Sequence, residues 1–475
     1  MKHKYSSITS VEIIADPMPC MTQLIQDKID ELENRGSDDA FCVCDIGDVV
    51  NKFKTWKELV PRVEPFYACK CNTDEVVVKT LADLGAGFDC ASKGEISLIL
   101  KQGVPTSRII YANPCKQKSF IKYAAKHNID MMTFDNEAEL IKIKDIYPSA
   151  RLVLRILPTS QIKVQCQLGN KFGCHPSNVY KLLNKAKQLN LNIMGISFHC
   201  GSGVQEAKAF SLAVKQAHDA WKIACDLGFN MTFLDIGGGF PGQKSAPITF
   251  PEIAALLNDA LDTYFPADMG VRIIAEPGRY FVASAYTLAV NIIAKRTVAR
   301  DISDADGPPD GHNQQEVTNN DEPSHMYYVN DGVYGSFNCI MYDHATAEAH
   351  VFSDSPLRFT SSVWGPTCDG LDCIIKECRL PEMEVGQWMY FPDMGAYTIA
   401  AGSTFNGMPR PTIHYICSRD TWNELYPDST SAKRRCESVS SEAEYPCMMA
   451  AGPDVMSLRE AANSISCIED ELVLA

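Results

Sequence analysis

The segment Pro65–Asn72 reads PFYACKCN and places one lysine, Lys70, at the end of a short apolar and aromatic run, between two cysteines. A lysine in apolar surroundings loses its proton more easily than a lysine in water. A neutral amine is the form that attacks a carbonyl carbon to make a Schiff base. A single lysine of this kind more often just follows a strand and reaches into water. The prediction of a nucleophile therefore depends on signals further along the chain.

Several other chemically useful residues also follow short apolar runs. An aspartate and an arginine come first, then a histidine and a run of three glycines, whose backbone N–H groups can approach an anion closely. A carboxylate and an arginine follow the last run. Each residue alone is typical of ordinary structure, but all of them share one kind of position. They are Asp89, Arg155, His199, Gly237, Gly238, Gly239, Glu276 and Arg279.

The spacing of the apolar runs predicts the architecture that must position these residues. Between residues 46 and 285, eight runs alternate with amphipathic helical stretches, such as one that follows Asp74 and ends at Gly85. Eight strand–helix units favour a closed (β/α)8 TIM-like barrel. An open doubly wound sheet is the alternative, but no G-x-G-x-x-G follows the first run. The predicted strands are Phe66–Lys70, Gly87–Asp89, Ile109–Tyr111, Met131–Phe134, Leu152–Ile156, Ile193–Phe198, Phe233–Ile236 and Arg272–Ala275.

Such a barrel would bring the chemically useful residues together. Barrel active sites lie at the carboxyl ends of the strands, and phosphate often binds between the seventh and eighth loops. A lysine, a phosphate cradle, a histidine able to stack on a ring and a carboxylate together indicate pyridoxal 5′-phosphate as cofactor. Glu276 would keep the pyridine nitrogen protonated, so that the ring accepts electrons.

The rest of the chain predicts a second domain and a tail. Residues 286–425 read as a β domain, with strands expected at Leu288–Ile293, Met326–Asn330, Val363–Trp364, Gln387–Phe391 and Thr412–Cys417. Residues 301–324 read as a mobile loop rich in Asp, Gly, Pro and Asn. Residues 1–45 are expected to join the β domain, and residues 426–475 to form a poorly ordered tail. The barrel takes residues 46–285.

Composition limits the possible partners and compartment. The chain has 475 residues and a net charge of −15, which argues against nucleic acid or an anionic membrane as the main partner. The longest apolar stretch, Val282–Ala294, is too short to span a bilayer, and no secretory signal is apparent. The 19 cysteines include two C-x-C pairs, Cys42/Cys44 and Cys69/Cys71, both expected on strands, and none has zinc spacing. We therefore expect reduced thiols, no metal site and a cytoplasmic protein.

Nine motifs carry a resemblance to a known family over roughly residues 10 to 425. The sequence resembles the eukaryotic ornithine decarboxylases, which are group IV pyridoxal-phosphate enzymes of the alanine-racemase-like fold. That fold is a (β/α)8 barrel with a C-terminal all-β domain. The motifs are PFYACKCN at 65–72, GFDCASKGEI at 87–96, YANPCKQ at 111–117, SFHCGSG at 197–203, LDIGGGFPG at 234–242, AEPGRY at 275–280, YVNDGVYGSFNC at 328–339, WGPTCDGLD at 364–372 and MGAYT at 394–398.

The resemblance implies a role for each matching residue. Lys70 would bind the cofactor covalently, His199 would stack on its ring, and Glu276 would pair with the pyridine nitrogen. The phosphate would be held by Ser202, Gly239, Arg279 and Tyr397, in a turn shaped by Gly237 and Gly238. The cofactor shell would be completed by Asp89, Glu95 and Arg155.

The resemblance also implies a head-to-tail homodimer with shared active sites. Cys368 and Asp369 would reach into the partner subunit's barrel, where Cys368 would protonate the α-carbon after CO₂ has left. Asp343 and Asp369 would face the distal ammonium of the substrate. The cofactor and substrate sites would be lined by Tyr334, Tyr342 and Phe405.

The implied activity is decarboxylation of L-ornithine to putrescine in polyamine biosynthesis, but two alternatives stay open. Departures from the family pattern at Cys69, Leu157–Pro158, Gly402 and Met408 could admit lysine or an aliphatic amino acid such as leucine. The family also contains non-catalytic antizyme inhibitors, although the cofactor residues of this chain match the active pattern. The segment from Lys116 to Glu139 resembles the antizyme-binding region, and it reads otherwise as an ordinary charged helix face with Lys118, Lys122 and Lys126.

Overall fold

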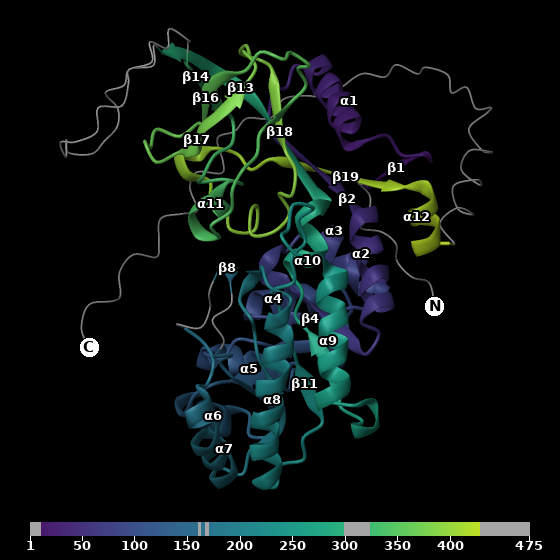
Figure 1. Ribbon diagram of the computed structural model, residues 1–475, viewed down its shortest axis with the longest axis vertical. Coiled ribbons are helices and arrows are strands. Elements are labelled where there is room, and N and C mark those ends of the chain that lie inside the picture. The colour runs from purple at the N-terminus through teal and green to yellow at the C-terminus, as the bar shows by residue number, and fades with distance from the viewer. Residues whose placement is uncertain (1–10, 160–162, 167–170, 299–323, 428–475) are drawn as a thin grey trace, which may run out of the picture. The chain divides into compact units, whose positions relative to one another are not determined.

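The computed structural model describes residues 11–159, 163–166, 171–298 and 324–427 (Figure 1). The described residues up to Leu425 belong to one compact unit. Most of the loop predicted at 301–324, most of the tail predicted from residue 426 and the first ten residues lie outside the described residues. No helix in the described part of the chain is long and apolar enough to cross a membrane.

Eight parallel strands close into a barrel, which confirms the predicted fold class. Closure is made by the last strand pairing with the first, so that Ile273 lies opposite Val63. Each predicted run matches a strand to within three residues at either end. In chain order the strands are β3 (Val63–Ala68), β4 (Gly87–Cys90), β5 (Ile109–Tyr111), β6 (Met131–Phe134), β7 (Arg151–Arg155), β9 (Asn192–Ser197), β11 (Phe233–Asp235) and β12 (Arg272–Ala275).

Helices alternate with the barrel strands because each carries an apolar face and clear end signals. Helix α3 (Glu75–Leu84) begins after Asp74, whose carboxylate accepts hydrogen bonds from the N–H groups of Val76 and Val77, and it ends at Gly85. Figure 1 shows α4 to α9 beside the barrel strands. The other helices of this part are α2 (Ile46–Leu59), α4 (Lys93–Lys101), α5 (Lys118–Lys126), α6 (Glu137–Ile146), α7 (Val179–Gln188), α8 (Lys208–Asp226), α9 (Phe250–Tyr264) and α10 (Arg279–Val282).

A nine-stranded sheet forms the β domain and takes strands from both ends of the chain. β2 (Phe41–Asp45), which precedes the barrel, pairs with β13 (Tyr286–Val298) and with β19 (Thr412–Ser418). The C-terminal strands were predicted except β15 and β17, whose sequences are short or strongly charged. The remaining elements are β1 (Val11–Ile14), β14 (Ser324–Val329), β15 (His350–Val351), β16 (Phe359–Trp364), β17 (Cys373–Leu380), β18 (Trp388–Phe391), α1 (Met21–Asn34), α11 (Asn338–Tyr342) and α12 (Arg419–Leu425).

Backbone hydrogen bonds tie the β domain to the loop that follows the first barrel strand. The N–H of Tyr397 donates to the carbonyl of Cys71 over 3.0 Å, and the side-chain amide of Asn72 donates to the carbonyl of Gly395 over 2.9 Å. Tyr397 has a φ of +57°, a conformation that side chains other than glycine rarely adopt. The segment that carries Tyr397 is thus fixed directly against the turn that carries Lys70.

Candidate active site

Lys70 lies in a tight turn just beyond the carboxyl end of β3. The strand ends at Ala68, and Cys69–Cys71 form a single 3₁₀ turn. The prediction that Lys70 and its flanking cysteines belong to a strand is therefore wrong. The chain leaves the sheet because the hydroxyl of buried Tyr67 donates to the carbonyl of Asn72 and folds the segment back on itself.

Lys70 forms an ion pair with Asp89, which stands at the end of the neighbouring strand β4. The Asp89 side chain is fully buried, whereas 37% of the Lys70 side chain is exposed. The second oxygen of Asp89, Oδ1, is buried without a hydrogen-bond partner among the described residues. The lysine is therefore held in place by one buried carboxylate while its amine stays accessible.

The expectation that Lys70 loses its proton easily is wrong for the protein without cofactor. Burial by itself lowers the pKa of Lys70, but the carboxylates of Asp89 and Glu276 outweigh burial and bring the pKa above the ordinary lysine value. The local sequence is apolar, as the prediction assumed. The opposing charges come from other strands, and no feature of the PFYACKCN segment reveals them.

Two carboxyl groups meet at the ends of β11 and β12. Asp235 Oδ1 accepts a hydrogen bond from the N–H of Gly237 over 2.8 Å, and both Asp235 and Glu276 are buried. Burial raises the pKa of Asp235 to about 7, and burial together with Asp235 raises the pKa of Glu276 well above the usual carboxyl range. The pair is stable in this setting when it holds a proton. The site therefore contains a carboxyl pair suited to face a protonated ring nitrogen.

His199 presents an uncharged ring to the same region. The N–H of Gly201 donates to His199 Nδ1 over 3.0 Å, so Nδ1 is an acceptor and the ring proton belongs on Nε2. Burial lowers the pKa of His199 well below its ordinary value, and the charges of Arg155 and Lys70 lower it further. A neutral, half-buried imidazole is suited to stack on an aromatic ring.

The three glycines after β11 lie where no side chain fits. A Cβ on Gly237 would stand 2.0 Å from the carbonyl oxygen of Phe198, and one on Gly238 would stand 2.6 Å from that of Glu276. A Cβ on Gly239 would stand 2.4 Å from the carbonyl oxygen of Gly201. The backbone can approach its neighbours this closely only as glycine, and no side chain of this turn screens the N–H groups of Gly238 and Gly239.

Arg279 is the cationic centre of the predicted phosphate site. Its Nη2 lies 3.0 Å from Ser202 Oγ and 2.7 Å from Asp343 Oδ2, and its guanidinium lies 5.1 Å from the ring centre of Tyr397. The side chain is only 5% exposed, and its Nε has no hydrogen-bond partner among the described residues. Three residues predicted to hold a phosphate thus meet, together with one carboxylate that was assigned to the substrate.

The residues assigned to the partner's active site form a separate group on the β domain. The Tyr334 hydroxyl donates to Asp369 Oδ2, and the rings of Tyr334 and Phe405 lie 4.4 Å apart. Cys368 is exposed, and its N–H donates to Asn406. In the described part of the chain, no hydrogen bond or ion pair joins this group to Lys70. Tyr342 is 74% exposed and belongs to neither set of contacts.

Two side chains of the site were not predicted to have a role. Asp235 was noted only as the end of a strand, although it lies against Glu276. Gln165 follows from no motif, yet its Nε2 donates to Asp343 Oδ2 over 3.1 Å and to the Asp343 carbonyl over 2.7 Å. It lies on β8 (Val164–Cys166), a short strand paired with β10 (Ser202–Val204), and nothing in its sequence marks it.

The residues present fit pyridoxal 5′-phosphate. Its aldehyde requires a lysine amine, its pyridine nitrogen a carboxyl, and its phosphate a cation with free N–H donors. Lys70, Glu276 and Arg279 supply these groups, and the unpartnered Arg279 Nε is a buried donor available to an anion. The neutral His199 ring adds a stacking surface.

Comparisons with known proteins agree with this chemistry. Residues 46–283 match the model of the pyridoxal-dependent decarboxylase family, pyridoxal binding domain. Mouse ornithine decarboxylase is 52% identical over 403 residues, 84% of this chain and 85% of the relative, and Xenopus laevis antizyme inhibitor 2 is 51% identical over 85% and 86%.

Solved structures agree as well. The arginine decarboxylase of Paramecium bursaria Chlorella virus has a TM-score of 0.75 and 34% identity, covering 83% of this chain and all of that one. The matches span both the barrel and the β domain, and the sequence identity to the curated relatives is high over most of their length. The chain therefore belongs to the eukaryotic ornithine decarboxylase family of pyridoxal-dependent decarboxylases.

Proposed function

We propose that this protein converts L-ornithine to putrescine and CO₂, with pyridoxal 5′-phosphate as cofactor, and so supplies polyamine biosynthesis. The observation that carries the proposal is the meeting of Lys70, Asp89, Glu276 and Arg279 around the carboxyl ends of the barrel strands. The test is a direct assay of the amine product and CO₂ from purified protein supplied with the cofactor and ornithine.

Different residues would bind different parts of the cofactor. Lys70 Nζ would hold its aldehyde carbon, Glu276 its pyridine nitrogen, and His199 one face of its ring. Ser202, Gly237, Gly238, Gly239, Arg279 and Tyr397 would surround its phosphate, with Asp89, Glu95 and Arg155 around them. When bound, the cofactor provides a protonated ring that accepts the electron pair left by the departing carboxylate.

The remaining steps belong to side chains of the protein. The bond between the α-carbon and the carboxylate breaks, CO₂ leaves, and Cys368 Sγ supplies the proton that the α-carbon then takes up. The resulting thiolate regains a proton from solvent. Cys368 is exposed in this chain and makes no contact with its own Lys70 among the described residues, which supports delivery of the thiol from a partner subunit.

A head-to-tail homodimer with shared sites follows from this separation. The side chains of Tyr342 and Phe405, also on the β domain, are 74% and 44% exposed, so a partner could cover them. Mixing Lys70→Ala protein with Cys368→Ala protein should restore about a quarter of wild-type activity, because half of randomly formed dimers are mixed and each has one intact site. No recovery after subunit exchange, verified by differently tagged subunits, would contradict shared sites.

Ornithine is favoured over leucine because of two carboxylates. Asp343 and Asp369 would pair with a distal ammonium, whereas an aliphatic side chain would offer these carboxylates no cation. Lysine is longer by one methylene, a difference that pockets discriminate only weakly. Competition among ornithine, lysine, arginine and leucine decides the substrate, and CO₂ release from leucine but not from ornithine would overturn the choice.

The antizyme-inhibitor alternative rests on the similarity to Xenopus antizyme inhibitor 2. Against it stand the cofactor residues, all of which are present in this chain. Visible absorbance of the purified protein distinguishes the two: colourless protein that gains no absorbance with added pyridoxal 5′-phosphate would favour the inhibitor.

We also infer that antizyme binds the segment from Lys116 to Glu139. Lys118, Lys122 and Lys126 are exposed along α5, where a partner can reach them. Changing these three lysines to glutamate should abolish co-purification with antizyme while leaving decarboxylation intact. The location proposed for the enzyme is the cytoplasm, since its described cysteines are free thiols, which persist in a reducing compartment.

A further inference from the structure

Arg279 is the best-placed cation for a phosphate, yet a carboxylate already contacts it. Asp343 Oδ1 and Oδ2 lie 2.9 Å and 2.7 Å from Arg279 Nη2, and the side chains are only 10% and 5% exposed. A buried arginine without an anionic partner is strongly destabilising. Asp343 therefore neutralises this cation in the protein without cofactor.

Gln165 holds the carboxylate in that position. Its Nε2 donates to both Asp343 Oδ2 and the Asp343 carbonyl. The Gln165 side chain lies against Gly203 of β10, where a Cβ would come within 2.8 Å of it. The two-stranded sheet of β8 and β10 thus fixes Gln165, and Gln165 fixes Asp343.

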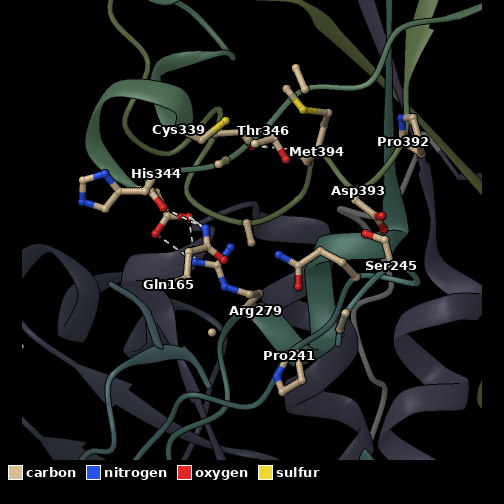
Figure 2. A pocket seen from close by; sticks show the side chains of 18 of the residues that line it. Gln165, Pro241, Ser245, Arg279, Cys339, His344, Thr346, Pro392, Asp393 and Met394 are labelled. Atoms are coloured by element: carbon tan, nitrogen blue, oxygen red, sulfur yellow. Dashed lines mark hydrogen bonds and ion pairs between the residues drawn. The ribbon is translucent and has the colours of Figure 1, made fainter. Parts of the chain in front are cut away.

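Asp343 also has space to move away from Arg279. A cavity of about 380 Å³ is lined by Gln165, Arg279, Asp343 and residues 344–348, and Figure 2 shows Gln165, Arg279 and His344 around it. Asp343 ends helix α11, and His344, with a φ of +54°, redirects the chain along the cavity wall. Burial raises the pKa of Asp343 although Arg279 opposes that shift, so the carboxylate remains poorly solvated where it lies.

We propose that Asp343 is an internal substitute for phosphate: it occupies Arg279 until the cofactor's phosphate arrives, and its release then makes its carboxylate available to the substrate's distal ammonium. This inference rests on the proposed function and deepens it, because it makes cofactor loading a condition for recognising a diamino acid. Two anions cannot share one guanidinium group without repulsion, so phosphate and Asp343 compete.

The test measures cofactor affinity and not activity. The affinity of cofactor-free protein for pyridoxal 5′-phosphate and for inorganic phosphate is measured by fluorescence titration and equilibrium dialysis. Asp343→Asn should bind both about tenfold more tightly than wild type, because the competing charge is gone. Gln165→Leu, which only loosens the carboxylate, should shift both affinities in the same direction by a smaller factor.

Asp369→Asn is the matched control. It removes the other carboxylate assigned to the substrate ammonium but does not contact Arg279, so it should raise the KM for ornithine and leave cofactor affinity unchanged. Unchanged or weaker cofactor binding by folded Asp343→Asn and Gln165→Leu would overturn the inference. If Asp343→Asn does not fold, the Gln165→Leu result alone decides.

Different experimental results would refute the proposed function and the inference about Asp343. If wild-type protein binds no pyridoxal 5′-phosphate, both fail. If it binds the cofactor and decarboxylates ornithine while neither variant changes the affinity, only the Asp343 inference fails. If the affinities shift as expected but ornithine is not decarboxylated, the inference about Arg279 stands and the substrate assignment fails.

Discussion

Lys70 and Asp89 come from neighbouring barrel strands and form an ion pair in which only the lysine reaches solvent. Asp89 lies opposite Ala68 in the register, two residues before Lys70, so the turn at Cys69–Cys71 brings the amine back over the carboxylate. The Lys70 amine is thus held in its protonated form by Asp89. The same carboxylate controls the pH at which the amine becomes neutral and can react.

Replacing Asp89 should make Lys70 react at lower pH. Asp89 contributes to the raised pKa of Lys70, so Asp89→Asn should lower that pKa and populate the neutral amine earlier as the pH rises. The rate at which cofactor-free protein captures pyridoxal 5′-phosphate, followed by visible absorbance, should reach its half-maximum at a lower pH than in wild type. An unshifted profile would mean that Asp89 does not control the amine.

Removing the amine itself should abolish catalysis. Lys70→Ala should reduce CO₂ release on the order of a thousandfold or more and remove the covalent visible absorbance of the bound cofactor. Lys101→Ala, at an exposed helix end, is the control and should behave as wild type. Full activity in Lys70→Ala would refute the proposed mechanism.

Because the pKa of Asp235 is raised in the folded protein, we expect the stability of the protein to depend on pH. Its pKa is raised to about 7 in the folded protein, above the unfolded value of about 3.9. A group that holds its proton more tightly when folded stabilises at low pH and loses that contribution as the pH rises through the folded pKa.

Asp235→Asn mimics the protonated form and should remove this dependence. In cofactor-free protein, the melting temperature of the variant minus that of wild type should therefore increase between about pH 5 and about pH 8. Asp226→Asn, at an exposed position, should give a difference that does not change with pH. A constant difference for Asp235→Asn would place its titration outside this range.

Adding a side chain to the glycine turn at residues 237–239 should disturb both folding and cofactor binding through steric clashes. In Gly237→Ala the new methyl group would collide with the carbonyl of Phe198, so we expect a loss of roughly 2 kcal/mol or more in unfolding free energy and weaker binding of pyridoxal 5′-phosphate. Gly228→Ala also has a positive φ, of +87°, but its methyl group meets nothing within 4 Å. Urea denaturation should show a smaller loss there, with cofactor affinity unchanged.

The buried ion pair of Lys116 and Glu139 predicts a large stability effect in the segment assigned to antizyme. Lys116 Nζ lies 2.9 Å from Glu139 Oε1, and both side chains are almost completely buried. Glu139→Ala would leave the lysine charge unpaired, which should cost about 3–5 kcal/mol in urea denaturation. Glu137→Ala, on the same helix but in an exposed pair with Lys185, should remain close to wild type. Antizyme studies should therefore alter the exposed lysines and leave this pair intact.

The barrel was predictable because its signals are local and repeated. Each run of β-forming residues is short, helix α3 has a capping residue, Asp74, and a glycine stop, and the count of eight has few architectural solutions. β17 was missed because its sequence, CIIKECRL, mixes charged and apolar residues without strict alternation. Its pairing with β16 determines the strand, and pairing is not visible in the segment itself.

The residues that make up the active site could be predicted from the sequence. Their charges and protonation states were harder to predict. The motifs nominate Lys70, His199, Glu276 and Arg279, and the structure places them at one end of the barrel. The protonation of Lys70 depends on Asp89 and Glu276, which reach it only through the closed sheet. The contact of Gln165 with Asp343 depends on a sheet of two three-residue strands, β8 and β10, that are distant in the chain and carry no periodic signal.

The position of β2 has a consequence for how the chain assembles. Its neighbours β13 and β19 begin about 240 and 370 residues later, so Phe41 and Val43 have no sheet to join until at least β13 has left the ribosome. The barrel, whose strands are contiguous, can form in the meantime. β2 therefore stays without a pairing partner for the whole time in which the barrel sequence is being synthesised.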